Sequence, residues 1–192
     1  MTRSGPTTPG PKWAGFDDPS PDSDADRAPE SDPESVARAI LLRQLTAGPR
    51  TRMQLTDALK RKNVPDEVAD ALLDRFTDVG LIDDVEFARM WAGSRHRGRG
   101  LGRRALAYEL RSKGVDDASI GAALAEISED DERQRAHDLV ARKMTSVSRL
   151  EPLKARQRLV GMLARRGYSL GLAESVVRDA LAQHAAEDDE AV

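Results

Sequence analysis

Residues 80–115 read GLIDDVEFARMWAGSRHRGRGLGRRALAYELRSKGV, and the pattern from which the whole chain is built is most complete here. Asp83 and Asp84 stand where a helix prefers an N-cap and a first-turn acid. A second amphipathic helix ends at Gly114, and between the two helices lies a run of glycine and arginine without an acid. The pattern predicts two helices joined by a flexible Gly-Arg connection. Their predicted inward faces consist of Phe87, Met90, Trp91, Ser94, Leu106 and Leu110.

The same plan recurs on both sides of this stretch. In each copy a Leu-x-x-x-Leu face is followed by basic residues and then by a residue suited to a left-handed helix end. Spacings of 51 and 53 residues separate the second leucines, which are Leu59, Leu110 and Leu163. The corresponding helix-ending residues are Asn63, Gly114 and Gly167. A repeat of this length is typical of helical arrays, in which neighbouring units bury one another.

The sequence therefore predicts an all-α fold: a tandem array of three three-helix repeats, forming an elongated, curved body with disordered tails. Repeat 1 is expected at residues 34–82, repeat 2 at residues 83–127 and repeat 3 at residues 128–184. Residues 1–33 are rich in Pro, Gly, Ser and Asp and have no apolar period, so we expect a disordered tail there. We expect a short acidic tail at residues 185–192.

Composition supports a helical protein of the cytoplasm. Only 4% of the 192 residues are aromatic, and the apolar residues are mostly Leu, Ala and Val, a mixture that favours helices. The absence of cysteine excludes disulfides and thiolate metal sites. No run of about 18 apolar residues and no signal-peptide core is present, so we expect no membrane association.

The charges are segregated along the chain. Residues 1–33 hold three basic and seven acidic residues, and residues 187–190 are all acidic. Residues 34–186 then hold 27 basic and 22 acidic residues, net +5, although the whole chain is −3. The folded part is therefore basic, which favours a polyanion or a carboxylate-rich partner.

A nucleotide site and a catalytic site are both disfavoured. Gly93 and Gly98 have P-loop spacing, but Arg99-Gly100 replaces the Lys-Ser/Thr pair that such loops need. Asp83 and Asp84 are interpreted as helix caps rather than metal ligands, because no further ligand cluster accompanies them. The three histidines, expected in exposed settings, are His96, His137 and His184. We expect no catalytic residue, cofactor or metal.

The basic stretch is the candidate binding surface. No acid occurs between Glu86 and Glu109, whereas arginines accumulate there and again in repeat 3. The predicted partner-binding residues are Arg89, Arg95, Arg97, Arg99, Arg103, Arg104, Arg111, Lys113, Arg156, Arg158, Arg165 and Arg166. They are suited either to nucleic-acid phosphates or to the carboxylates of a protein partner.

The segment GLIDDVEFARMW, with Ser94-Arg95, the Gly-Arg connection and RRALAYELRSKGV, resembles the core signature of the RecX regulatory proteins. The resemblance covers about residues 34–184. It implies a non-enzymatic regulator that binds the RecA recombinase, or its filament on single-stranded DNA. Such a protein would inhibit the ATPase and recombinase activities of RecA in DNA repair, homologous recombination and the SOS response.

Direct DNA binding stays open as the alternative. Some members of that family also contact DNA, and an Arg-rich face could bind single- or double-stranded DNA without RecA. We expect a monomer in either case.

Overall fold

The computed structural model describes residues 32–190, with side chains as far as residue 186, and all regular structure in this range is helical. The expected N-terminal tail lies outside the described residues, except for its last two. The helices are α1 (Pro33–Thr46), α2 (Arg52–Lys60), α3 (Asp66–Asp78), α4 (Asp84–Arg99), α5 (Arg103–Ser112), α6 (Asp117–Ala125), α7 (Glu129–Met144), α8 (Pro152–Arg165) and α9 (Leu170–Glu190). Within the described range, no helix is long and apolar enough to cross a membrane.

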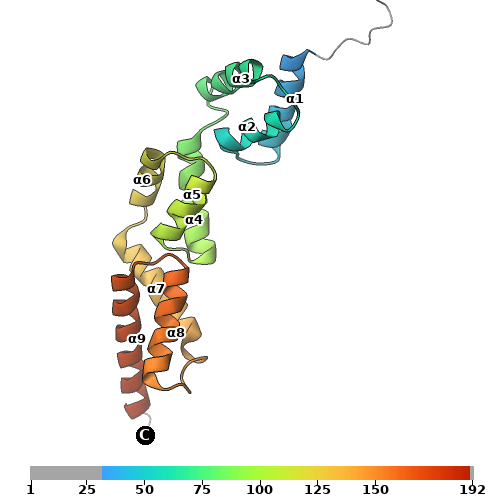
Figure 1. Ribbon diagram of the computed structural model, residues 1–192. Coiled ribbons are helices and arrows are strands. Elements are labelled where there is room, and N and C mark those ends of the chain that lie inside the picture. The colour runs from blue at the N-terminus through green and yellow to red at the C-terminus, as the bar shows by residue number, and fades with distance from the viewer. Residues whose placement is uncertain (1–31, 191–192) are drawn as a thin grey trace, which may run out of the picture. The chain divides into compact units, whose positions relative to one another are not determined.

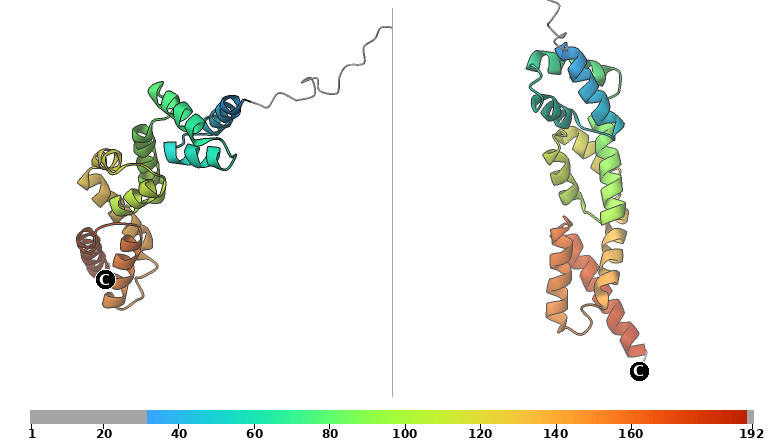
Figure 2. Two further views of the ribbon diagram at one scale, coloured as in Figure 1. Left: turned by 45° about the horizontal axis from the view of Figure 1, so that its top comes forward. Right: turned by 90° about the vertical axis from the view of Figure 1, so that its right-hand side faces the viewer.

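The helices form three groups of three in chain order, α1–α3, α4–α6 and α7–α9 (Figure 1). Two further views show the same grouping (Figure 2). Each group has its own buried apolar core, which for α4–α6 consists of two adjoining clusters. The predicted all-α array of three tandem three-helix repeats is confirmed.

The middle helix of each repeat carries the Leu-x-x-x-Leu face into its core. All six of these leucines are at most 1% exposed. Burial of each side chain contributes roughly 2 kcal/mol to the stability of the folded state. The leucines are Leu55 and Leu59 in α2, Leu106 and Leu110 in α5, and Leu159 and Leu163 in α8. The leucines whose spacing revealed the repeat are thus the ones that form the core of each unit.

The residue that ends each middle helix adopts a left-handed conformation, as predicted. Its φ is 55° at Asn63, 80° at Gly114 and 86° at Gly167. Glycine has no Cβ to strain this conformation, and asparagine is among the side chains that tolerate it. The chain therefore turns sharply after each middle helix and enters the third helix of the repeat.

Repeat 1 is joined to repeat 2 at the start of α2. The Thr51 hydroxyl, fully buried, donates to the carbonyl of Lys113 at the end of α5 (2.6 Å). The Arg52 amide donates to Asp84 Oδ1 in α4 (2.9 Å). Two groups of repeat 2 therefore satisfy polar groups at the first turn of α2.

Repeat 2 is joined to repeat 3 in the corresponding way, at the start of α5. The Gly102 and Arg104 amides donate to the carbonyls of Arg166 and Gly167 at the end of α8 (2.8 and 3.2 Å). The Arg103 amide donates to Glu132 Oε1 in α7 (2.9 Å). In both joints, the middle helix of one repeat begins against the end of the next middle helix and an acid of the next first helix.

The second joint requires glycine. A Cβ on Gly167 would lie 2.3 Å from the Ala105 amide nitrogen, and one on Gly102 would lie 2.8 Å from the Gly167 backbone. Tyr168 closes the joint, because its buried hydroxyl donates to the Gly100 carbonyl (3.2 Å). Burial raises the pKa of this hydroxyl to about 12.

Some details differ from the sequence prediction. Met90 is 46% exposed, because two small residues, Ala88 and Ala92, complete the inner face of α4. The sequence prediction did not include these two alanines in this face. Ser94 is also exposed. At the C-terminus, α9 runs to Glu190, into the segment where we expected a tail. Alanines at residues 182, 185 and 186 favour this extension, since alanine is the best helix former.

Candidate partner-binding surface

The predicted flexible Gly-Arg connection is mostly helix, which corrects the expectation from the sequence. Helix α4 continues to Arg99 and ends at Gly100, whose φ is 63°. Only residues 100–102 connect it to α5. Arginine is a good helix former and its charge is favourable at a helix C-terminus, so Gly93 and Gly98 are tolerated inside the helix. The arginines of this segment are therefore held on a helix rather than in a loop.

His96 is buried, contrary to our expectation of an exposed histidine. It is 7% exposed, and its Nδ1 lies 2.9 Å from the carbonyl oxygen of Leu101. The flanking arginines suggested exposure, but they point to other sides of the helix because neighbours are about 100° apart. His96 therefore holds the short turn that follows α4.

Arg95 and Lys113 are engaged inside repeat 2. The Arg95 guanidinium and the Lys113 ammonium each lie 4.1 Å from the ring centre of Trp91. The Trp91 Nε1–H donates to Glu109 Oε2 (2.8 Å), and Arg95 Nε lies 3.6 Å from the same oxygen. These two predicted contact residues thus stabilise the stacking of α4 and α5 through cation–π contacts.

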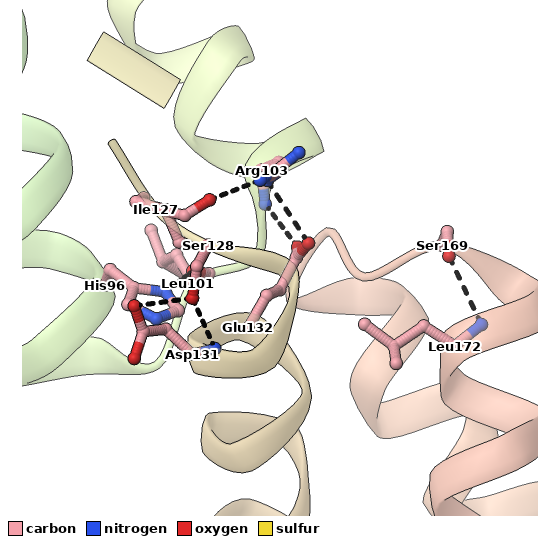
Figure 3. A network of polar contacts seen from close by, with 9 residues as sticks. All are labelled: His96, Leu101, Arg103, Ile127, Ser128, Asp131, Glu132, Ser169 and Leu172. Atoms are coloured by element: carbon pink, nitrogen blue, oxygen red, sulfur yellow. Dashed lines mark hydrogen bonds and ion pairs between the residues drawn. The ribbon is translucent and has the colours of Figure 1, made fainter. Parts of the chain in front are cut away.

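Arg103 is engaged in the joint between repeats 2 and 3 (Figure 3). Its guanidinium donates to the carbonyl of Ile127, and its Nε lies 3.5 Å from Glu132 Oε2. Glu132 is only 9% exposed, whereas the Arg103 side chain is 35% exposed, so one partner of the pair is buried and the other is half-buried. The position of Arg103 indicates a structural role, although it belonged to the predicted binding set.

Three other predicted residues form ion pairs on the surface. They are Arg89 with Glu126 (2.8 Å), Arg111 with Asp117 (2.7 Å) and Arg156 with Glu174 (3.7 Å). All six side chains are 46% exposed or more, so each pair is worth at most about 1 kcal/mol. These arginines can exchange their partners at little cost.

Three of the remaining predicted residues lie together near the joint between repeats 2 and 3. Arg97, Arg99 and Arg166 line one cleft of about 500 Å³. Two arginines of α7 that sequence reasoning missed, Arg135 and Arg142, line it as well. They lie seven residues apart, a spacing that places both on one face of a helix, but the four acids in the first turn of the same helix obscured this face. We call this group of five the arginine cleft.

Arg104, Arg158 and Arg165 are exposed. No hydrogen bond or ion pair of their guanidinium groups occurs within the described residues. Arg158 and Arg165 line a smaller pocket between α7 and α8, together with Lys143. Of the predicted set, five residues thus line the two pockets beside α7 and α8, whereas Arg95 and Lys113 are held at Trp91; the five are Arg97, Arg99, Arg158, Arg165 and Arg166.

Asp83 and Asp84 act as helix caps. Asp83 Oδ1 accepts from the Glu86 amide (2.8 Å), and Asp84 accepts from Arg52 at the first joint. Burial raises the pKa of the Asp84 carboxyl above its ordinary value of 3.8, and the hydrogen bond from Arg52 opposes this shift. Both carboxylates thus have a structural explanation.

The chain is a tandem helical-repeat protein with a basic cleft beside the joint between repeats 2 and 3. Family models match each repeat: RecX first three-helix domain at residues 37–76, second at residues 83–124 and third at residues 129–177. The chain belongs to the RecX family of regulatory proteins.

Curated relatives named "Regulatory protein RecX" are similar over most of the chain. The protein of Streptomyces lividans is 52% identical over 162 residues, covering 84% of this chain and 86% of the relative. That of Thermobifida fusca is 53% identical over 163 residues, covering 84% and 87%. That of Mycolicibacterium smegmatis is 49% identical over 154 residues, covering 78% and 81%. These names support a regulatory role.

Two solved structures share the fold. RecX from Lactobacillus salivarius superposes with a TM-score of 0.73 at 18% identity, covering 78% of this chain and 97% of that one. A second structure, described as regulatory protein RecX, gives 0.71 at 21% identity, covering 76% and 73%. At these identities the likeness concerns the arrangement of the helices.

Proposed function

We propose that this chain binds RecA, or the RecA filament on single-stranded DNA, and lowers its ATPase and recombinase activities in DNA repair and the SOS response. It does so in the cytoplasm, as a monomer and without catalysing a reaction. One observation carries the proposal: in a chain of the RecX family, the exposed arginines of repeats 2 and 3 meet at a joint held by backbone hydrogen bonds.

The mechanism follows from the repeat. A filament presents the same surface at regular intervals, and a tandem array can contact more than one protomer, which raises the overall affinity. The exposed guanidinium groups can pair with carboxylates in a bidentate way. A rigid binder that joins neighbouring protomers opposes the movements between them that accompany ATP hydrolysis.

The test is a RecA ATPase assay on single-stranded DNA with increasing amounts of this protein. We expect a saturable fall in the hydrolysis rate. A variant with Arg97, Arg99 and Arg104 replaced by Gln should need roughly ten-fold more protein for the same effect, because three exposed charge-assisted contacts are lost. Arg95 stays unchanged, since it supports Trp91.

A charge-matched variant provides the control. Arg43, Arg61 and Lys62 are exposed residues of repeat 1, and their replacement by Gln removes the same charge away from the joint. This variant should inhibit like the wild type. A hydrolysis rate that does not change at any concentration of the wild-type protein contradicts the proposal.

Direct DNA binding is the second candidate, and the arginine cleft is the observation that favours it. The cleft is lined by five arginines and no acid. Binding to bare single-stranded DNA that equals binding to RecA-coated DNA, with a steep salt dependence, would favour this candidate over the first.

A further inference from the structure

The outer face of helix α5 carries an exposed aromatic ring. The inner face of this helix places Leu106 and Leu110 in the core of repeat 2, where both are 0% exposed. Tyr108 lies two residues from each leucine and therefore on the opposite side of the helix, because neighbouring residues are about 100° apart. It is 75% exposed, the highest fraction among the large apolar residues that the structure describes. The ring thus faces solvent.

The fold does not require an aromatic residue at this position. The leucine spacing aligns Tyr108 with Asp57 in repeat 1 and with Gly161 in repeat 3, each two residues before the second leucine. Both of those repeats form the same three helices and bury the same pair of leucines. Within residues 32–186, the Tyr108 hydroxyl forms no hydrogen bond and its ring no aromatic or cation–π contact. The ring is therefore available for a contact outside the chain.

Two arginines flank Tyr108 on the same face. Arg104 lies four residues before it and Arg111 three residues after it, spacings that place all three side chains in one row. The row extends over about 10 Å of helix axis. Arg104 is exposed and forms no ion pair within the described residues. Arg111 pairs with Asp117 at 2.7 Å, but both side chains are at least 60% exposed, so another carboxylate can replace Asp117 at little cost.

This row has the composition of an energetic centre in a protein interface, where tyrosine and arginine are enriched. A tyrosine ring offers a large apolar surface with few rotatable bonds, and the guanidinium fork matches a carboxylate. The row therefore fits an apolar side chain that lies between two carboxylates. A partner helix running alongside α5 presents this pattern when two acids lie one heptad apart, because its own rise gives the same distance of about 10 Å.

The surroundings of the row favour a protein over a nucleic acid. Glu109, Asp116 and Asp117 all lie within nine residues of Tyr108. Asp116 and Asp117 are exposed. A nucleic-acid strand carries a charge on every nucleotide, so some of its phosphates would lie close to these acids and be repelled. Two carboxylates at defined positions avoid this repulsion, since one of them takes the place of Asp117 beside Arg111.

We propose that Arg104, Tyr108 and Arg111 form a docking face for an acidic amphipathic helix of a partner protein. An apolar side chain of that helix packs on the Tyr108 ring, and one carboxylate pairs with each arginine. We call these three residues the tyrosine face. The inference deepens the proposed function, because it assigns residues and a chemistry to the protein contact, and it rests on that function only for the identity of the partner. Tyr108 does not belong to the binding residues predicted from the sequence, which were chosen by charge alone.

The first arm of the test uses the full chain and needs no RecA. Two-dimensional NMR spectra of the ¹⁵N-labelled protein detect even weak binding as shifts of the backbone amide signals. The probe is a synthetic helical peptide of about 20 residues, rich in alanine and glutamine, with two glutamates one heptad apart and a leucine between them. One control peptide has glutamine in place of both glutamates, and another has alanine in place of the leucine. Single-stranded oligothymidylate is titrated separately.

We expect the complete peptide to shift the amide signals of residues 104–112 in a saturable way. Each control peptide should bind about five-fold more weakly. Tyr108→Ala should weaken binding of the complete peptide roughly ten-fold, whereas Tyr108→Phe, which keeps the ring, should bind like the wild type.

Two controls separate a contact role of the ring from a structural one. Leu153→Ala removes another exposed apolar side chain, 58% exposed in α8, and should bind the peptide like the wild type. Tyr108→Ala should keep the Tm of the wild type or raise it slightly, because alanine is the better helix former. A ring that stabilised repeat 2 would instead lower the Tm when removed.

The second arm measures inhibition of the RecA ATPase on single-stranded DNA. Tyr108→Ala should need roughly ten-fold more protein for half-maximal inhibition, and Leu153→Ala should inhibit like the wild type. If the wild-type protein does not inhibit RecA, the proposed function fails, while the peptide arm still decides whether the tyrosine face exists. Specific peptide binding, with RecA inhibition unaffected by Tyr108→Ala, would support the tyrosine face and assign it to a protein other than RecA.

Two results overturn the inference. One is that the signals of α5 do not shift with the complete peptide, or shift equally with all three peptides. The other is that oligothymidylate shifts the signals of α5 as strongly as the complete peptide does, because the ring would then stack on nucleobases rather than pack against an acidic helix.

Discussion

Replacement of Glu132 tests whether the joint between repeats 2 and 3 is stabilised as the contacts indicate. Glu132 is 9% exposed, accepts from the Arg103 amide at 2.9 Å and lies 3.5 Å from Arg103 Nε. Glu132→Ala removes the acceptor of this amide, which costs about 1 kcal/mol, and leaves the Arg103 side chain without its acid. A fully buried pair would lose about 3–5 kcal/mol, but Arg103 is 35% exposed and water compensates in part.

We therefore expect a loss of about 2 kcal/mol for Glu132→Ala. For a chain of this size, that loss lowers the Tm by about 4 to 8 °C. Glu132→Gln keeps an oxygen for the Arg103 amide and loses only the charge, so it should cost about half as much. The assay is thermal unfolding followed by far-ultraviolet circular dichroism at neutral pH, with urea unfolding as an independent measure of the free energy.

Glu129 provides the matched control, because it is an exposed acid in the first turn of the same helix. Glu129→Ala should cost only a few tenths of a kcal/mol through the helix dipole. Equal Tm values for Glu132→Ala and Glu129→Ala would mean that the contact between the repeats contributes nothing beyond a first-turn charge, contrary to this prediction.

Two further perturbations address the joints. Gly167→Ala should lower the free energy of unfolding in urea by about 2–4 kcal/mol, because the φ of 86° and the Ala105 backbone 2.3 Å away both exclude a Cβ. In the control Gly171→Ala, the new Cβ meets open space in α9, so this change should be neutral or stabilising. The pKa of Asp84 is raised in the folded state, so the folded state binds this proton more tightly than the unfolded state. The contribution of Asp84 to the free energy of unfolding therefore falls as the pH rises from about 3.8 through the raised pKa. Asp84→Asn keeps an acceptor for Arg52 and should abolish this fall, so an unfolding free energy that changes identically with pH in both proteins would contradict the assignment.

Much of the fold could be predicted because its determinants are local. The Leu-x-x-x-Leu faces, the left-handed residues at 63, 114 and 167, and the N-caps Asp83 and Ser128 all act within a few residues of sequence. The repeat of about 50 residues then required each unit to pack on the next. The apolar faces, the caps and the left-handed residues all indicate the same helix boundaries, which is why the prediction was consistent.

The joints could not be predicted, because they depend on contacts distant in sequence. Arg103 meets Glu132 across 29 residues, and the Thr51 hydroxyl meets the Lys113 carbonyl across 62. A charge pattern does not reveal which cations are used inside the structure and which remain exposed. Arg103 is therefore a residue of the joint, although the acid-free sequence around it suggested a free surface.

The arginine cleft also depends on features that the local sequence pattern does not show. Its α4 arginines were predicted from a local pattern, but the pattern suggested a loop, whereas helix propensity and the dipole extend α4 to Arg99. Arg135 and Arg142 were missed because four acids precede them in the same helix, and only their shared helix face brings them to the cleft.

The most direct test of the proposed function is a titration of labelled protein against single-stranded DNA coated with RecA and ATPγS, beside the same strand bare, at one ionic strength. We expect saturable binding to the coated strand with a lower Kd than to the bare strand. We also expect ATP hydrolysis in a parallel assay to fall along the same isotherm. Equal or weaker binding to the coated strand, with hydrolysis unchanged at saturation, would show that the proposed function is wrong.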